Sequence, residues 1–272
     1  MTIKRKWIPI LAAFFFCVFL FLHFDAYEVF IFQDGALPKD YKFQLQQPFE
    51  EITMKANDGA SINGLLLKTK NTPKGIILYF HGNRNNLSRW ASECAYLTDY
   101  GYLVLVVDYR GYGKSTGIRN EANFYADAYL AYQHCKTLFP PEKIVAYGRS
   151  LGTGPACWLA ANAKLQALVL ETPYTRFTDL VEQKVLGFPM RWFLNYQFDN
   201  LNQLRNIDEP VLIVHGTDDS LIPISHAQSL SKVCKHPNSG FLVVKGGGHN
   251  NLPTYQTYKD GLDYFLKKAD KN

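Results

Sequence analysis

The sequence has few cysteines, and their arrangement argues against two common kinds of structural cross-link. The 272-residue chain carries five, an odd number, and no two of them form a Cys-x-x-Cys pair. The pattern therefore predicts neither a disulfide framework nor a zinc site, although one bridge between distant cysteines stays open. Most of the five fall in stretches expected to be helical, where cysteine usually acts as a small buried apolar group. They are Cys17, Cys94, Cys135, Cys157 and Cys234.

The chain also lacks a strong excess of charge, internal repeats and low-complexity segments. Its net charge of +5 is modest, and the basic residues are spread out, with one tight cluster at residues 4–6. Nothing in this distribution predicts a nucleic-acid-binding surface. With 47% hydrophobic residues the chain can bury one substantial core, and single α/β domains commonly reach about 200–250 residues.

Charge is absent altogether from an apolar stretch near the N-terminus. Residues 7–22 have no charged or polar side chain, and His23 and Phe24 extend the stretch to eighteen residues. As a helix it would be about 27 Å long, close to the hydrocarbon thickness of a bilayer. A cleavable signal peptide is the alternative, but its apolar core is usually about 7–15 residues long and small residues follow it. Bulky residues follow here, so residues 7–24 are predicted to be an uncleaved transmembrane anchor.

The charges that flank this anchor predict its orientation. Residues 4–6 are basic, whereas Asp25, Glu28 and Asp34 follow the span. Because basic residues favour the cytoplasmic side of a membrane, residues 1–6 are expected in the cytoplasm and the rest of the chain on the non-cytoplasmic side. Residues 25–48 then form a linker, and residues 49–272 form the folded domain.

Within that domain, apolar strands alternate with helices. The strands are continuously apolar, which is typical of a parallel sheet covered by helices on both faces. A hairpin at the start of the domain would add antiparallel strands at one edge. Residues 173–210 are too long and too apolar for a plain connection, and they predict a small helical cap over the carboxyl ends of the strands. Strands are expected at residues 50–55, 62–68, 75–80, 102–107, 143–146, 167–170, 211–214 and 241–244, and helices at 87–100, 121–137, 155–164 and 254–268.

One strand leads into the five-residue motif Gly148-Arg149-Ser150-Leu151-Gly152. Alone this Gly-x-Ser-x-Gly pattern is weak, and a Gly- and Ser-rich turn would explain it equally well. The strand before it and the helix after it match a nucleophile elbow, which lifts a serine hydroxyl out at the end of a strand. Gly148 and Gly152 would be needed because a Cβ there would collide with the neighbouring strand and helix.

A serine hydroxyl needs a base, and the base needs a carboxylate to orient it. The chain supplies both in the order Ser, Asp, His, each after an apolar strand. His249 lies in a glycine-rich loop, where it has little packing reason to be. For the acid we favour Asp219, three residues after a glycine, and expect Asp218 to shape the turn. Glu171, at the end of the preceding strand, stays an outside candidate.

The remaining pieces of such a site are two N–H donors for an oxyanion, worth about 3 kcal/mol each. One is expected to be the backbone N–H of Leu151, the residue after the nucleophile. The other is expected from the loop after the strand that ends at residue 80, where the N–H of Asn83 is best placed. His81 and His215 follow strands too, and we interpret both as structural residues.

Together these motifs resemble the α/β-hydrolase superfamily. The residues that carry the resemblance are His81-Gly82-Asn83, Asp108 to Ser115, Gly148 to Gly152, Gly216 to Pro223 and His249-Asn250. More narrowly, the chain is similar to membrane-anchored α/β-hydrolase-domain proteins of type thirteen, with the type-seventeen protein depalmitoylases as near relatives. The resemblance covers roughly residues 50 to 270 and implies an α/β-hydrolase fold, a mostly parallel sheet with helices on both faces, a small cap and an N-terminal transmembrane helix.

The resemblance also implies roles for individual residues. Ser150 would be the nucleophile, Asp219 the acid and His249 the base, with residues 108–113 as a structural loop beside the site. Thr153 departs from the pattern, because many relatives have a second glycine there. The family includes serine aminopeptidases, so membership leaves the substrate open.

Our first hypothesis is a serine hydrolase that cleaves an ester or thioester through an acyl-enzyme, without a metal or cofactor. Phe188, Trp192 and Phe193 in the cap suggest a pocket for an acyl chain, although such residues also simply pack a cap. A serine peptidase with the same triad and a catalytically silent, membrane-tethered binding module are the alternatives. A dehalogenase is disfavoured because the elbow carries Ser150 and not an aspartate. The sequence indicates neither the physiological substrate nor the oligomeric state.

Overall fold

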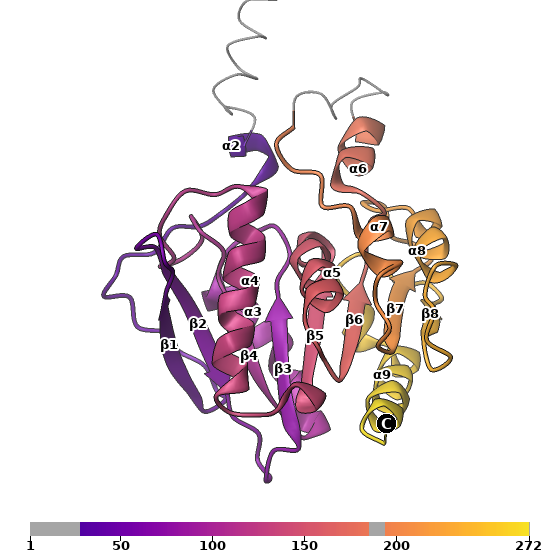
Figure 1. The fold of residues 1–272 in the computed structure, drawn as a ribbon, viewed down its shortest axis with the longest axis horizontal. Helices are drawn as coiled ribbons and strands as arrows, with labels where there is room; N and C mark the ends of the chain where they lie inside the picture. The colour runs from indigo at the N-terminus through magenta and orange to yellow at the C-terminus, as the bar shows by residue number, and fades with distance from the viewer. Residues whose placement is uncertain (1–27, 185–193, 272) are drawn as a thin grey trace, which may run out of the picture.

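The computed structural model describes residues 28–184 and 194–271, which fold around one eight-stranded sheet (Figure 1). The strand order is β1-β2-β4-β3-β5-β6-β7-β8. The first hairpin is antiparallel, and its second strand pairs antiparallel with β4, whereas every pair from β4 to β8 is parallel. The bounds are β1 Phe49–Lys55, β2 Ser61–Leu67, β3 Gly75–Phe80, β4 Tyr102–Val107, β5 Ile144–Arg149, β6 Ala167–Glu171, β7 Val211–Gly216 and β8 Gly240–Val244. This confirms the predicted α/β-hydrolase fold, with the hairpin at one edge.

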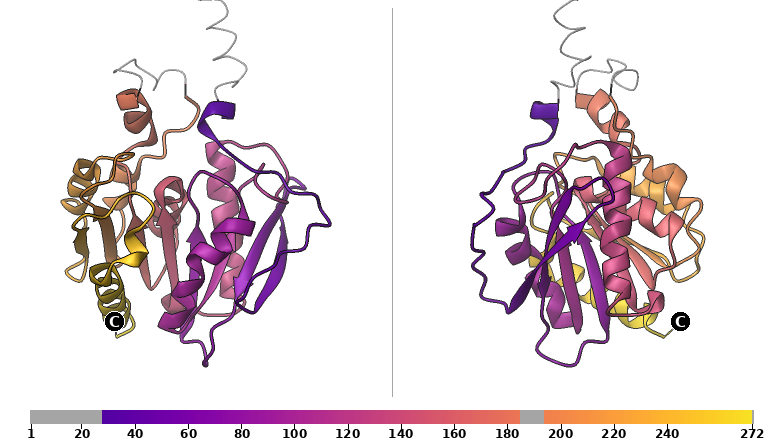
Figure 2. Two further views of the ribbon diagram at one scale, coloured as in Figure 1. Left: turned by 180° about the vertical axis from the view of Figure 1, so that it is seen from behind. Right: turned by 60° about the vertical axis from the view of Figure 1, so that its left-hand side comes forward.

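Helices cover both faces of the sheet, as the apolar strands require (Figure 2). On one face lie α3 (Leu87–Cys94), which continues as a 3-10 helix over Ala95–Tyr100, and α9 (Gln256–Ala269). The other face carries α4 (Glu121–Lys136), α5 (Thr153–Asn162), α7 (Asn200–Leu204) and α8 (Ile224–Ser231). Asn86 and Asn120 cap α3 and α4, because their side-chain oxygens accept a backbone N–H of the first turn.

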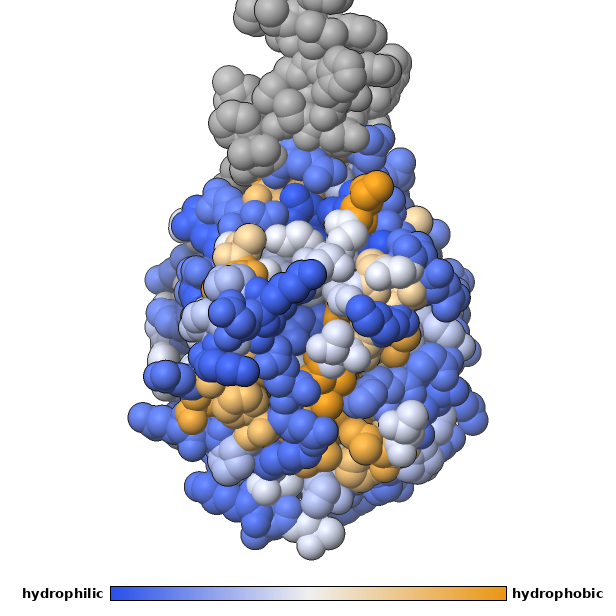
Figure 3. Space-filling model, turned by 90° about the vertical axis from the view of Figure 1, so that its left-hand side faces the viewer, coloured by the Kyte–Doolittle hydropathy of each residue, from blue (hydrophilic) through white to orange (hydrophobic). Residues whose placement is uncertain are grey.

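The two edges of the sheet differ from its centre. All six residues of β3 and of β5 are buried, whereas the edge strand β1 carries exposed charged residues such as Glu51 and Lys55. Figure 3 faces the β1 edge, and most of its surface is hydrophilic with small apolar groups between. Charged side chains on an edge strand oppose pairing with another sheet.

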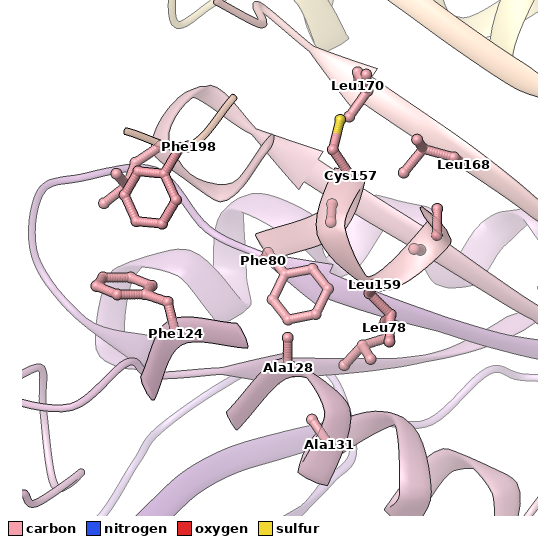
Figure 4. Packing of buried hydrophobic residues seen from close by; sticks show 14 of the residues in the cluster. Leu78, Phe80, Phe124, Ala128, Ala131, Cys157, Leu159, Leu168, Leu170 and Phe198 are labelled. Atoms are coloured by element: carbon pink, nitrogen blue, oxygen red, sulfur yellow. The ribbon is translucent and has the colours of Figure 1, made fainter. Parts of the chain in front are cut away.

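The larger part of the core lies between the sheet and helices α4 and α5 (Figure 4). Leu78 and Phe80 point from β3 toward Ala128 of α4 and toward α5, which contributes Cys157. The thiols of the four described cysteines are free, and burial raises the pKa of Cys135, so these residues act as apolar core groups as expected.

Two segments cross the carboxyl ends of the strands, the end at which α2 and α6 stand in Figure 1. Helix α2 (Glu28–Ile31) begins the described chain, and residues 32–48, where the sequence predicts a linker, lie against the domain. Phe32 is 2% exposed and stacks on Phe177, the first residue of α6 (Phe177–Lys184), with ring centroids 6.4 Å apart. Helices α6 and α7 fall within the predicted cap.

Some expectations concern residues that the structure does not describe. The predicted anchor at 7–24 and the predicted pocket residues Phe188, Trp192 and Phe193 all lie outside the described residues. Within residues 28–184 and 194–271, no helix has the length and apolar character needed to cross a bilayer.

We expect Leu78→Ala to lower the free energy of unfolding by about 2–5 kcal/mol, because Leu78 is fully buried and the substitution leaves a cavity. Leu138→Ala is the matched control, since Leu138 is 44% exposed, and its cost should stay within about 0.5 kcal/mol. Denaturant unfolding followed by circular dichroism measures both. Equal losses in the two variants would contradict this account of the core.

Candidate active site

The turn between β5 and α5 holds Ser150 in a strained conformation. Its φ is 52°, in the left-handed region that costs a residue with a Cβ about 1–3 kcal/mol. A Cβ at Gly148 would collide with Ala156, and one at Gly152 would collide with the carbonyl of Phe80. Two glycines therefore let helix and strands approach closely enough to hold the serine in this turn, as predicted for a nucleophile elbow.

Ser150, His249 and Asp219 meet although they are far apart in the sequence. The Nε2 atom of His249 lies 3.1 Å from the Ser150 hydroxyl oxygen. Its Nδ1 atom lies 2.8 Å from Asp219 Oδ2. A proton on Nδ1 that is donated to the carboxylate leaves the Nε2 lone pair directed at the serine hydroxyl. The structure thus brings together the three residues that the sequence singled out.

The environment of Asp219 keeps its carboxylate ionised. Its side chain is fully buried, and burial raises the pKa. The hydrogen bond and charge of His249, together with the N–H groups of Ile222 and Leu221, outweigh burial, so the pKa of Asp219 lies below its ordinary value. Both N–H groups donate to Oδ1, at 2.9 and 2.8 Å, which leaves Oδ2 for the histidine.

The other acid candidates lie elsewhere. Asp218 is exposed and accepts a hydrogen bond from the neighbouring Thr217 hydroxyl, so it belongs to the turn as expected. Glu171 is 1% exposed and lies 3.3 Å from Arg149 Nε in a buried ion pair. Neither carboxylate contacts His249 within the described residues.

The two neighbouring histidines are buried and have structural partners. His81 contacts the carbonyl of Gly82 and the carboxylate of Asp108, at 2.7 and 3.1 Å. His215 contacts the Gly216 carbonyl, and burial lowers its pKa, which favours a neutral ring. Neither reaches Ser150.

The predicted oxyanion donors are the backbone N–H groups of Leu151 and Asn83. Leu151 is the second residue of the 3-10 helix Ser150–Gly152, where the first N–H groups have no partner within the helix. The backbone N–H of Asn83 donates no hydrogen bond within the described residues. Asn83 and Ser150 line the same cavity, and Leu151 follows Ser150 directly in the chain, so both N–H groups are candidates to bind an oxyanion formed at Ser150.

That cavity has a volume of about 580 Å³ and is lined by both polar and apolar residues. Its apolar lining consists of Phe177, Leu180 and Val181 of α6, with Leu221, Ile31 and Trp90. The described lining also contains the arginines at positions 84, 89 and 149 but no aspartate or glutamate. The size suits a small ligand with an apolar part.

Sequence reasoning missed the role of Arg149, the second residue of the motif. Its guanidinium is buried and pairs with Glu93 at 3.0 Å and with Glu171. It also donates to Asn250 Oδ1, at 3.1 Å, and to the backbone carbonyl of His249, at 3.4 Å. Arg149 thereby ties the elbow to the loop that carries the histidine. The signal was a charge at the end of an otherwise apolar strand.

Comparison with known proteins places this chain in a family. Residues 71–203 match the family model described as serine aminopeptidase, S33. The chain is 30% identical over 233 residues to alpha/beta hydrolase domain-containing protein 17B of Homo sapiens, an alignment that covers 84% of this chain and 78% of that protein. It is also 36% identical over 200 residues to alpha/beta hydrolase domain-containing protein aho-3 of Caenorhabditis elegans, covering 70% of this chain and 57% of the relative.

Solved structures agree on the fold. An esterase of Pyrococcus furiosus superimposes with a TM-score of 0.68 at 19% identity, covering 86% of this chain and 99% of the esterase. The ferulic acid complex of Est1E from Butyrivibrio proteoclasticus also gives 0.68, at 18% identity, over 81% of this chain and 100% of that one.

Fold and relatives together define a hydrolase. The chain belongs to the α/β-hydrolase superfamily and is a relative of the alpha/beta hydrolase domain-containing proteins, which confirms the resemblance drawn from its motifs.

The lowered pKa of Asp219 predicts a pH dependence of stability. A carboxylate whose pKa is lower in the folded than in the unfolded chain stabilises the fold above its ordinary pKa of about 3.9. That contribution disappears as the pH falls through the folded-state value. We therefore expect the difference in unfolding free energy between wild type and Asp219→Asn to be constant near neutral pH and to shrink in acid.

Urea unfolding at pH values from about 7 to about 2 measures this difference. Asp218→Asn removes a carboxylate from the same turn and is the matched control. A difference between wild type and Asp219→Asn that does not change over the whole series would contradict the coupling between Asp219 and His249.

Proposed function

We propose that this protein is a membrane-anchored serine hydrolase that cleaves an ester or thioester through an acyl-enzyme. The proposal rests on the hydrogen-bonded triad of Ser150, His249 and a buried, ionised Asp219, which is called the relay below. The substrate we infer is a small molecule or an acyl chain, held in the 580 Å³ cavity with its apolar wall from α6. The reaction uses no metal or cofactor.

In the first half of the reaction, Ser150 Oγ attacks the acyl carbon and its proton moves to His249 Nε2. The N–H groups of Asn83 and Leu151 receive the negative charge that develops on the acyl oxygen. The bond to the leaving oxygen or sulfur then breaks, and His249 returns the proton to that atom. Asp219 stabilises the protonated imidazole between these two transfers.

In the second half, a water molecule attacks the acyl-enzyme. His249 takes a proton from the water, the Ser150 ester bond breaks, and the proton passes to Ser150 Oγ. The products are a carboxylic acid and the free enzyme, so the cycle consumes only water.

The cavity disfavours an aminopeptidase. Such an enzyme must accept the positively charged amino terminus of a peptide, which calls for a carboxylate nearby. The described lining has three arginines and no acidic residue, and Arg84 has no ion-pair partner among the described residues. The undescribed segment 185–193 contains no Asp or Glu in its sequence. A neutral or anionic substrate therefore suits this cavity better.

We further propose that residues 7–24 anchor the enzyme in a membrane, with residues 1–6 in the cytoplasm and the hydrolase domain on the other side. The support is the uncharged stretch of eighteen residues and the charges that flank it. The described chain begins at the end of the sheet where the cavity lies (Figure 1). A membrane-tethered domain would then meet acyl chains close to the bilayer.

We expect a fluorophosphonate probe to label the detergent-solubilised full chain. The same probe should not label the variants Ser150→Ala and His249→Ala. Turnover of p-nitrophenyl esters by these variants should fall by about 10³ to 10⁶, the cost of removing members of such a relay. His236→Ala, a change at a half-buried histidine outside the cavity, is the matched control and should label like the wild type.

Probe labelling and turnover measurements also distinguish this proposal from the peptidase and from the silent binding module. Cleavage of aminoacyl p-nitroanilides in preference to esters would favour the peptidase. A folded wild type that is neither labelled nor active would reject the proposal in favour of a silent binding module. A series of esters with increasing acyl length would then define what the cavity accepts.

A further inference from the structure

The segment that follows the predicted anchor forms part of the wall of the active-site cavity. Ile31 and Gln33 line this cavity together with Ser150 and His249. They precede the first strand of the sheet by more than a dozen residues, in a stretch that the sequence indicates to be a linker. The hydrogen bonds of this segment lead directly to the loop that carries the second oxyanion donor.

Asn83 is the centre of these contacts. Its side-chain Nδ2 donates to the backbone carbonyl of Ile31, and its Oδ1 accepts the backbone N–H of Gln33 at 3.3 Å. Oδ1 also accepts the hydroxyl of Tyr112, at 2.8 Å. The amide plane is therefore held by partners from two other parts of the chain. Its orientation, and with it the backbone of residue 83, depends on residues 31–33.

Asn85 and Asn86, in the same loop, also form hydrogen bonds with the N-terminal segment. The N–H of Asn85 donates to the Gln33 carbonyl at 3.1 Å, and Asn86 Nδ2 donates to the Gly35 carbonyl at 2.7 Å. Asn85 has a φ of 65°, the left-handed region that few residues other than glycine adopt. Ile31, Gln33 and Gly35 thus hold the loop of residues 83–86 in a turn whose backbone conformation at Asn85 is intrinsically unfavourable.

The segment is itself held from its other side. Asp34 pairs with Arg119 at 2.7 Å, and the guanidinium of Arg119 lies 4.4 Å from the centre of the Phe32 ring. The N–H of Gly113 donates to the Gly35 carbonyl, at 3.0 Å. Since Phe32 is also buried among aromatic rings, the segment forms a rigid support for the loop.

We infer that Asn83 has a second role besides offering its backbone N–H: its side chain is a positioning group that aims this N–H at the oxyanion. On this inference residues 31–35 and Tyr112 act on catalysis through Asn83. The inference rests on the proposed serine hydrolysis. An oxyanion donor helps only if it is oriented before the charge develops, so a loosened donor should lower kcat more than it raises KM.

The test is a double-mutant cycle between Asn83 and Tyr112 in the full chain, with p-nitrophenyl acetate as the substrate. Tyr112 does not line the cavity, and Tyr112→Phe removes only the hydroxyl that holds Asn83 Oδ1. We expect Asn83→Ala to lower kcat by about 10-fold to 100-fold, less than the loss of a donor altogether. Tyr112→Phe should cost a few-fold in kcat alone and nothing further in the Asn83→Ala background.

Two further variants separate positioning from stability. Asn83→Asp keeps the shape and the acceptor for Gln33 but loses the donor to Ile31, so its kcat should fall as well. Tyr132→Phe removes a hydroxyl that donates to the Lys164 carbonyl at 2.9 Å, outside the cavity, and is the matched control for losing such a bond. Thermal midpoints measured alongside identify any variant that has lost its fold.

The outcomes are distinct. Losses from Asn83→Ala and Tyr112→Phe that multiply in the double variant, or that equal the loss in Tyr132→Phe, would overturn the inference and leave the proposed function intact. A wild type that the fluorophosphonate probe does not label would overturn the proposed function, and this inference with it.

Discussion

Close contact between backbones at the elbow is the constraint on which the rest of the site depends. The carbonyl of Phe80 occupies the space where a Cβ of residue 152 would lie, so α5 can sit against β3 and β5 only with glycine there. That contact forces Ser150 into its left-handed conformation and holds its hydroxyl within reach of His249. The cost of the strained turn is offset by a core in which the strands on both sides are fully buried.

A buried ionic cluster beneath the elbow extends this constraint to the histidine loop. Removing a charge such as Arg149 from water is expensive unless partners compensate it. Here Glu171 and Glu93 supply opposite charge, and Tyr147 and Tyr258 donate to the Glu171 carboxylate. The remaining guanidinium donor reaches Asn250 and the His249 carbonyl. Ser150 and His249 therefore share one support, although 99 residues separate them.

The N-terminal segment likewise supports the loop that carries Asn83 through contacts from a distant part of the chain. Residues 31–35 bond to Asn83, Asn85 and Asn86, and two of them, Ile31 and Gln33, line the cavity next to Ser150. The loops that carry His249 and Asn83 are thus each held by contacts from remote parts of the chain. These contacts explain how a cavity lined by loops and helices from different parts of the chain can hold its polar groups in place.

The sequence by itself determined the strands, the elbow and the order of the relay residues. Continuous apolar runs mark buried parallel strands whatever surrounds them, and Gly148 and Gly152 are local requirements of a tight turn. The choice of Asp219 also followed from its spacing after Gly216. Only the tertiary structure decided that Arg149 joins the elbow to the histidine loop, and that Ile31 and Gln33 line the cavity and hold Asn83. These contacts join residues fifty to a hundred positions apart, and periodicity along the chain carries no information about which distant backbone atoms a side chain will meet.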